Sequence, residues 1–197
     1  MRVPAQVAIA AFLLAGWSQA SYHYVHYPSR NSFTPIFEKF NLATLPNNTV
    51  SFFVADQGAN TYGNESFGSV LSQLKQAAAA WNSVGVSDLR VTFGGLESYT
   101  DSPSTARPGN ALPVSGVPGG DVIFVDTPGL LGLGAPTIST VAVQSPSGPF
   151  FPIVRGLVMI RRDSTQDPWP SYSESFFTTA VHEIGHALGL QHTWTNS

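Results

Sequence analysis

Hydrophobic residues follow two different spacings along the chain, and each spacing predicts a different kind of element. Five short runs are rich in β-branched and aromatic residues, as strands are: 49–55, 89–93, 121–126, 138–143 and 153–161. Residues 67–81 instead place apolar side chains three and four positions apart, which predicts a helix with one buried face. The centre of 121–126 is almost uniformly apolar, so we expect that strand to be buried.

A second helical pattern lies close to the C-terminal end of the sequence. Ser171 and Glu174 fit a capping box, in which the serine caps the first turn and the glutamate reaches back. An apolar stripe then recurs at helical spacing through Phe177, Val181 and Ile184, and it continues beyond them. The stripe predicts a helix that packs one face into the core.

The order of these elements is strand, helix, four strands and helix, which predicts an α+β fold. A strand, a helix and a strand in succession favour a parallel crossover connection. We therefore expect a twisted, mostly parallel sheet of about five strands. The helix at 67–81 would back the sheet, and the second helix would follow its last strand.

The first residues have the pattern of a signal peptide, which would span residues 1–20. Arg2 supplies the positive end, Val7 to Ala15 are uniformly apolar, and small residues flank a cleavage site after Ala20. The apolar run is shorter than the roughly 20 residues that cross a bilayer, so no membrane span is expected. We expect a secreted protein, either extracellular or periplasmic.

Residues 21–46 would form an N-terminal extension or a pro-segment, and 35–45, bounded by prolines, fits a short helix. A strap over the domain is a third interpretation, and all three remain open. His23 and His26 alternate with aromatic residues in this segment. A metal site there is one interpretation and a solvated terminus is the other.

Composition narrows the function classes. The net charge is −3 and charged residues make up 11% of the chain, without a basic cluster, so nucleic acid is not an expected partner. The chain has no cysteine, so stability must come from the core or from a bound metal. We expect a monomer.

The second helix contains the motif H-E-x-x-H-x-x-G-x-x-H with every fixed position filled. His182 and His186 lie four apart on one helical face, where both can bind one metal ion. Glu183 is near enough to reach a water on that metal. Gly189 can take the left-handed conformation that ends a helix, so that the chain returns His192 as a third ligand. Three imidazoles and an open position are typical of a catalytic Zn²⁺ site.

This motif resembles the signature of the metzincin zinc peptidases, with the matrixin-like members most similar in the order of their elements. The resemblance implies that His182, His186 and His192 bind zinc, that Glu183 is the general base and that Gly189 is the turn residue. It also implies a protein or peptide substrate, cut by a zinc-activated water.

The sequence departs from the family pattern after the third histidine. The family has a methionine turn beneath the metal, whereas Met1 and Met159 both precede the motif here. Residues 47–197 are thus expected to form a metzincin-like catalytic domain whose C-terminal subdomain is missing. A non-catalytic zinc-stabilised binding module, or an inactive fragment of a larger peptidase, is the alternative to an active metalloendopeptidase.

Leu131, Gly132, Leu133 and Gly134 are the candidate substrate-binding residues. In the resembled family an edge strand above the zinc pairs with extended substrate, and glycine lets a substrate backbone approach closely. Ordinary turn glycines are the alternative interpretation. Four aspartates could supply oxygen ligands for Ca²⁺, although no spaced calcium loop is present: Asp121, Asp126, Asp163 and Asp167.

Overall fold

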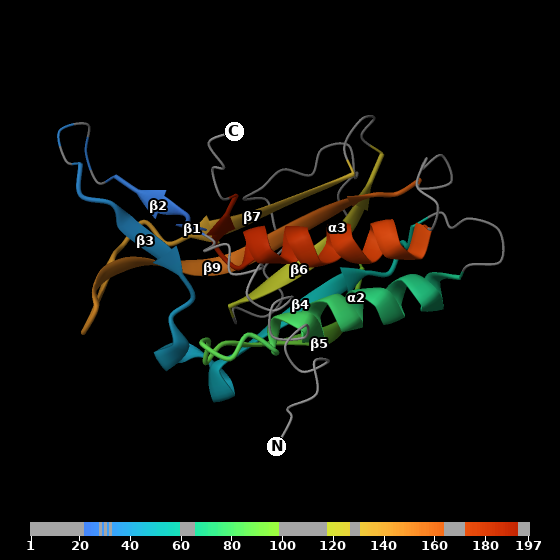
Figure 1. Ribbon diagram of the computed structural model, residues 1–197, viewed down its shortest axis with the longest axis horizontal. Helices are drawn as coiled ribbons and strands as arrows, with labels where there is room; N and C mark the ends of the chain where they lie inside the picture. Colours follow the sequence, from blue (N-terminus) through green and yellow to red (C-terminus); the bar gives the residue numbers. More distant parts are fainter. Residues whose placement is uncertain are drawn as a thin grey trace, which may run out of the picture.

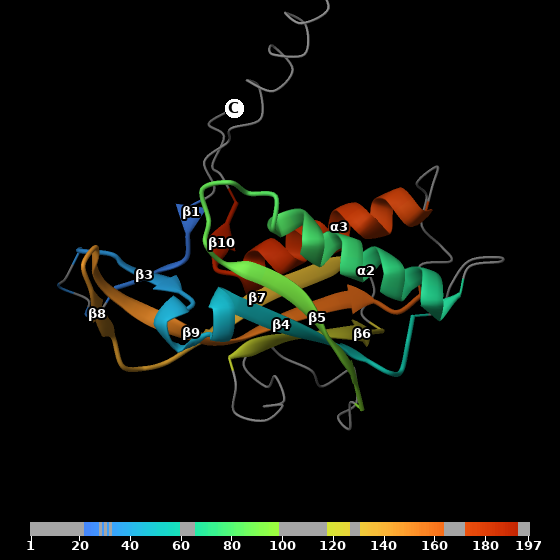
Figure 2. The same ribbon diagram turned by 90° about the horizontal axis from the view of Figure 1, so that it is seen from below.

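The computed structural model describes residues 22–59, 66–98, 118–126, 131–163 and 172–192, apart from positions 28, 30 and 32. Two helices lie together on one side of a twisted sheet (Figures 1 and 2). The sheet has eight strands and is mostly parallel, so the expected mixed class with a mostly parallel sheet is confirmed. The predicted signal peptide lies outside the described residues.

Four parallel strands form the centre of the sheet in the order β5-β4-β6-β9. Their bounds are Thr49–Ala55 for β4, Arg90–Glu97 for β5, Gly119–Val125 for β6 and Gly148–Arg161 for β9. All seven residues of β6 are buried, as its apolar centre predicted. The strand at 49–55 is also confirmed.

The long strand β9 organises the rest of the sheet. On one side it pairs with β6 and with the short parallel strand β3 (Ile36–Lys39), to which β2 (Val25–His26) adds an antiparallel neighbour. On its other side lie two antiparallel strands, β7 (Gly132–Ile138) and β8 (Val143–Ser145).

The expected count of about five strands is wrong, because β2, β3 and β8 also join the sheet. They are only two to four residues long and show no alternation, but the extra length of β9 gives β3 and β8 partners. The strand expected at 138–143 is also misplaced. Pairing with β9 begins at Gly132, so the glycine-rich stretch itself is strand β7.

The N-terminal segment is part of the folded unit. The helix expected at 35–45 is wrong, since β3 and a short 3-10 turn at Leu42–Thr44 occupy this range. Before them, β1 (Tyr22–His23) pairs antiparallel with β10 (Leu190–Gln191), which follows the second helix. The structure therefore joins residues near the two ends of the described chain.

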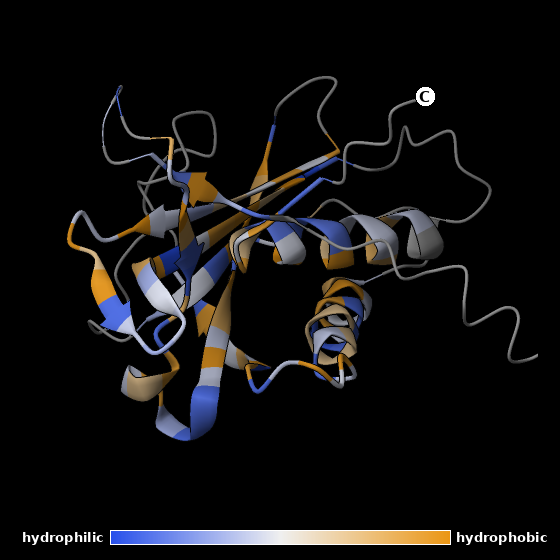
Figure 3. Cartoon of the chain, turned by 60° about the vertical axis from the view of Figure 1, so that its left-hand side comes forward, coloured by the Kyte–Doolittle hydropathy of each residue, from blue (hydrophilic) through white to orange (hydrophobic). Residues whose placement is uncertain are grey.

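The two long helices pack against each other and against the sheet. Helix α2 (Phe67–Trp81) has the bounds that its pattern predicted and is capped by the side chain of Ser66. Helix α3 spans Tyr172–Ala187, and its predicted cap at Ser171 lies outside the described residues. Figure 3 shows hydrophobic positions along both helices and along the neighbouring strands.

A tryptophan fixes the contact between the helices. The indole Nε1 of Trp81 in α2 donates a hydrogen bond of 3.1 Å to the carbonyl of Val181 in α3. A Cβ at Gly185 would lie 2.7 Å from the Trp81 ring, so only glycine leaves room for the indole. This contact helps to position the motif-bearing turn of α3.

A charged cluster is buried within the central strands. Arg155 donates two hydrogen bonds to Asp121, one of them from Nε at 2.8 Å, and both side chains are almost inaccessible. Glu97 lies beside this pair. Burial raises the pKa of Glu97 to about 8, the Asp121 carboxylate adds to the rise, and Arg155 opposes it.

The protonated state of Glu97 should make stability fall with rising pH. Its ordinary pKa is 4.5, so between that value and about 8 the unfolded chain loses a proton that the folded chain keeps. We expect the melting temperature to decrease from pH 5 to pH 8.5 and the Glu97→Gln variant to lose part of this decrease. An unchanged slope in that variant, followed by circular dichroism, would contradict the assignment.

Candidate metal centre

Helix α3 places three of the motif residues. His182 is exposed, while His186 and Glu183 are buried, with Glu183 only 7% accessible. One turn separates the two histidines, so their rings lie side by side with centroids 4.6 Å apart. The buried face of the helix is formed by Phe176, Ala180 and Ile184, which fasten it to the core.

A turn at the end of α3 returns the chain to the two helical histidines. Gly189 has a φ of 99° there, so the left-handed conformation expected from the motif is present. Its amide donates to the carbonyl of His186 at 2.9 Å. Strand β10 then leads to His192, which lies against the other two rings.

The three imidazoles converge through one nitrogen each. The Nε2 atom of His182 lies 3.1 Å from that of His186 and 2.9 Å from that of His192, and the last two are 2.9 Å apart. Within the described residues, this is the one group of three or more metal-binding side chains. The three histidines could hold a metal ion.

The hydrogen bonding around His186 fits a ligand role. Its Nδ1 lies 2.6 Å from the carbonyl oxygen of Leu190, which can only accept, so Nδ1 carries the proton. The unprotonated Nε2 then directs its lone pair towards the other two rings. A backbone acceptor on the distal nitrogen is the usual way in which proteins orient a metal-binding histidine.

Electrostatics favour the neutral form of His182 that ligation requires. Desolvation lowers its pKa, and the positive charges that His186 and His192 can carry lower it further. Three nitrogens this close cannot all be protonated without strong repulsion. The set therefore fits a cation with imidazole ligands, a preference shared by zinc and several transition metals.

Glu183 presents a carboxyl group with altered acidity beside this cluster. Burial raises its pKa, while the charge of His186 and a backbone hydrogen bond with Gly134 lower it. A carboxyl group whose pKa is raised in this way is a stronger base than an exposed glutamate, which suits a proton acceptor. The arrangement combines a site that could hold a metal with an adjacent proton acceptor.

Strand β7 lies directly against the motif helix, and its glycines have a packing role that the sequence did not reveal. A Cβ at Gly132 would lie 2.6 Å from Cγ of Glu183. A Cβ at Gly134 would overlap the Glu183 carbonyl oxygen and lie 2.9 Å from Cβ of His186. Neither glycine is in a turn, so the interpretation as ordinary turn glycines is wrong.

The same strand offers an edge for pairing. Among the described residues β7 pairs only with β9, so the backbone groups of its other edge face no strand. Leu131 and Leu133 are 41% and 37% exposed and do not belong to the core. Their substrate-binding role stays a prediction, as does that of the two glycines.

Gly134→Ala should disturb the site through this contact. The added methyl group meets backbone rather than a movable side chain, so α3 must shift, at a cost of about 2 kcal/mol in unfolding free energy. Metal affinity should decrease with it. Gly85→Ala is the matched control, because nothing lies within 4 Å of that position. Equal melting temperatures and equal metal affinities for the two variants would contradict the packing role.

Tyr24, the residue after the N-terminal strand β1, reaches the metal centre, which sequence reasoning missed. The amide of Tyr24 donates to the carbonyl of Gly189 at 2.8 Å, and its ring contacts that of His186 edge-on with centroids 6.4 Å apart. Burial raises the pKa of Tyr24, with added effects from Glu38 and Glu183. The alternating aromatic residues at 22–27 were the one signal of a strand there.

The calcium candidates do not gather. Asp121 is held by Arg155 in the core, and Asp126 is exposed beside Arg162, with 3.5 Å between the charged atoms. Among the described residues, Asp163 belongs to no group of side chains that could hold a metal ion. Asp167 lies outside the described residues.

Comparison with models of known protein families finds no match, and comparison with characterised proteins finds no relative. None of the helices in the described ranges combines the length and the apolar character that crossing a bilayer requires. The functional interpretation therefore rests on the residues of the site itself.

Proposed function

We propose that this protein is an exported zinc-dependent endopeptidase of the metzincin type. The observation that carries the proposal is the convergence of three Nε2 atoms within 3.1 Å, with the buried carboxyl group of Glu183 on the same helix. The chain order of strands and helices, which is similar to that of the upper half of a metzincin domain, supports it.

The chemistry divides between the ion and the chain. A zinc ion held by the three histidines would polarise a carbonyl group and lower the pKa of a water. Glu183 accepts the proton of that water and delivers it to the amine that leaves when the peptide bond breaks. Its raised pKa favours the first of these steps, because a more basic carboxylate accepts a proton from water more readily.

One edge of β7 pairs with no described strand, and this edge supports an extended peptide as the substrate. Its backbone groups can pair with a substrate chain beside Glu183, and Leu133 provides an apolar contact at the edge. The glycines that bring β7 against α3 also bring this edge to the catalytic carboxyl group. The distance between a bound peptide and Glu183 is thus set by helix packing.

A non-catalytic zinc-stabilised module is the second candidate. Strand β10 favours this candidate, because it has only two residues and is held by two residue pairs with β1. An ion that ties His192 to α3 would stabilise this end of the chain without any reaction.

Hydrolysis of a broad protein substrate, with and without a chelator, distinguishes the two. We expect cleavage by the purified protein, loss of cleavage with 1,10-phenanthroline and recovery when zinc is restored. Both candidates predict a lower melting temperature after metal removal. A protein that binds zinc and melts higher with it, but cleaves nothing, would support the second candidate against the first.

A further inference from the structure

A cavity of about 350 Å³ lies between β3, the end of α3 and the tip of the β8-β9 hairpin. None of the three clustered histidines lines it, and neither does Glu183. The cavity is therefore separate from the metal centre. Its size lies at the lower end of the range of about 300–1,000 Å³ that is usual for small-molecule sites.

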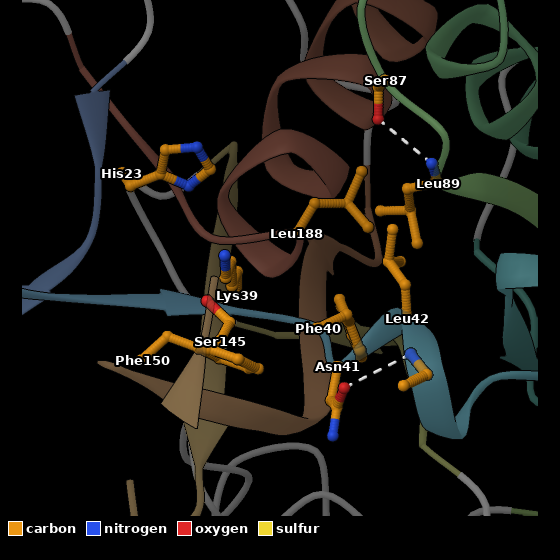
Figure 4. Close-up of a pocket in the computed structure, with 11 residues that line it drawn as sticks. His23, Lys39, Phe40, Asn41, Leu42, Ser87, Leu89, Ser145, Phe150 and Leu188 are labelled. Atoms are coloured by element: carbon orange, nitrogen blue, oxygen red, sulfur yellow. Dashed lines mark hydrogen bonds between the residues drawn. The ribbon is translucent and has the colours of Figure 1, made fainter. Parts of the chain in front are cut away.

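The walls of this cavity differ from end to end. Figure 4 shows Leu188, Leu89 and Leu42 together at one end, whereas the ammonium of Lys39 and the ring of His23 lie at the other. The ring of Phe150 forms the floor beneath Lys39, with Nζ 4.6 Å from its centroid. A ligand with an apolar body and one polar group would fit both ends of the cavity.

Lys39 has no carboxylate partner in the described part of the chain. Besides the Phe150 ring, its one contact is with Oγ of Ser147 at 3.5 Å, which is long for a hydrogen bond. Desolvation lowers the pKa of His23 and the Lys39 charge lowers it further, although a hydrogen bond to the Glu38 backbone opposes them. The polar end thus holds a cation for which the described residues supply no counterion.

Three neutral polar side chains of the cavity take part in local hydrogen bonds. The hydroxyl of Ser145 donates to the carbonyl of Gly148 at 2.7 Å. Ser87 accepts from the amide of Leu89 at 3.2 Å, and the side-chain oxygen of Asn41 accepts from Ala43. The donor with a full positive charge in this cavity is the ammonium of Lys39, and a charge-assisted hydrogen bond is stronger than a neutral one, so the cavity favours an anion over a neutral polar ligand.

We propose that this cavity binds a small apolar carboxylate, with the carboxylate on Lys39 and the apolar part among Leu42, Leu89 and Leu188. A free arylalkanoic or short fatty acid has this chemistry, and so does the apolar C-terminal residue of a peptide. The site does not depend on the metal centre or on peptidase activity.

Isothermal titration with two pairs of compounds tests the proposal. The first pair is 3-phenylpropionate and its amide, and the second is acetylglycylphenylalanine and its C-terminal amide. We expect at least one acid to bind about tenfold more tightly than its amide, because a charge-assisted contact is lost in the amide. The acid that binds more tightly identifies the free acid or the peptide end as the source.

Three variants locate the binding. Lys39→Met should remove the preference for the acid, and Leu89→Ala should weaken acid and amide alike. Lys75→Met is the matched control, because Lys75 also lies over a phenylalanine ring, at 4.5 Å from the centroid of Phe93, but does not line the cavity. Circular dichroism shows that each variant is folded.

A carboxylate could also bind at the metal, so the titrations are repeated with His182→Ala. Binding that persists there, with a preference for the acid that Lys39→Met removes, supports the cavity. Binding that disappears in His182→Ala and survives in Lys39→Met overturns the proposal. Equal affinities for acid and amide, or no binding by either acid, also overturn it.

Discussion

Replacing Glu183 with alanine is expected to lower the rate of peptide hydrolysis by about a hundredfold to ten-thousandfold while metal binding is retained. The carboxyl group is buried and lies beside the histidines without belonging to the converging nitrogens, so its loss removes the proton acceptor and leaves the ligands. Turnover and metal content are measured on the same preparation, by peptide cleavage and by mass spectrometry of the bound metal.

Glu38→Ala is the matched control for that experiment. Glu38 is also buried, and burial likewise raises its pKa, but it belongs to β3 and not to the motif. A loss of activity in Glu183→Ala that Glu38→Ala does not share is specific to the site. Substantial hydrolysis by the Glu183 variant would rule out the proposed proton transfer.

Tyr24→Pro is expected to weaken metal binding by about tenfold to a hundredfold, a range typical of changes to groups that orient ligands. Proline lacks the amide that donates to Gly189, so the turn before His192 loses its hydrogen bond to the residue that follows β1. Metal affinity is measured by competition with a chromogenic chelator.

Two further variants separate the backbone link from other effects. Tyr24→Phe keeps the amide and the ring, so its affinity should stay close to that of the wild type. Tyr27→Pro places the same substitution at an exposed residue beyond the strand. If Tyr27→Pro weakened binding as much as Tyr24→Pro, the link between Tyr24 and Gly189 would not explain the effect.

This second prediction also bears on the N-terminal segment. A removable pro-segment would be expected to leave an intact metal site when it is lost. Strand β1 pairs with β10, and Tyr22 lies opposite Gln191. We therefore expect a chain that begins after residue 27 to bind metal more weakly. Comparing metal affinity in the long and short chains measures this directly.

Long local patterns were readable from the sequence. The apolar stripe of α2 and the uniform centre of β6 each depend on neighbouring residues, and both elements form where they were predicted. The convergence of His182 and His186 also follows from helix geometry alone. The return of His192 needed only one further feature, the left-handed Gly189.

Pairings between distant segments were not readable. Strands of two residues, such as β1 and β10, contain too few positions to show alternation, and their partners lie at opposite ends of the chain. The glycines of β7 raised a different difficulty. Glycines in a strand indicate that another group packs closely against the backbone. Only the fold shows that the group at Gly134 is helix α3.

The pairing of β1 with β10 has a consequence for biosynthesis. During translation the strand at Tyr22–His23 leaves the ribosome first, and its partner at Leu190–Gln191 follows only after nearly the whole described chain. Contacts between such distant segments form slowly, because the chain must first close a very long loop. The third histidine is therefore placed late, and a chain in which β1 and β10 have not yet paired would hold only the two helical ligands in position. Binding of a metal by all three histidines would then follow the pairing of these two strands.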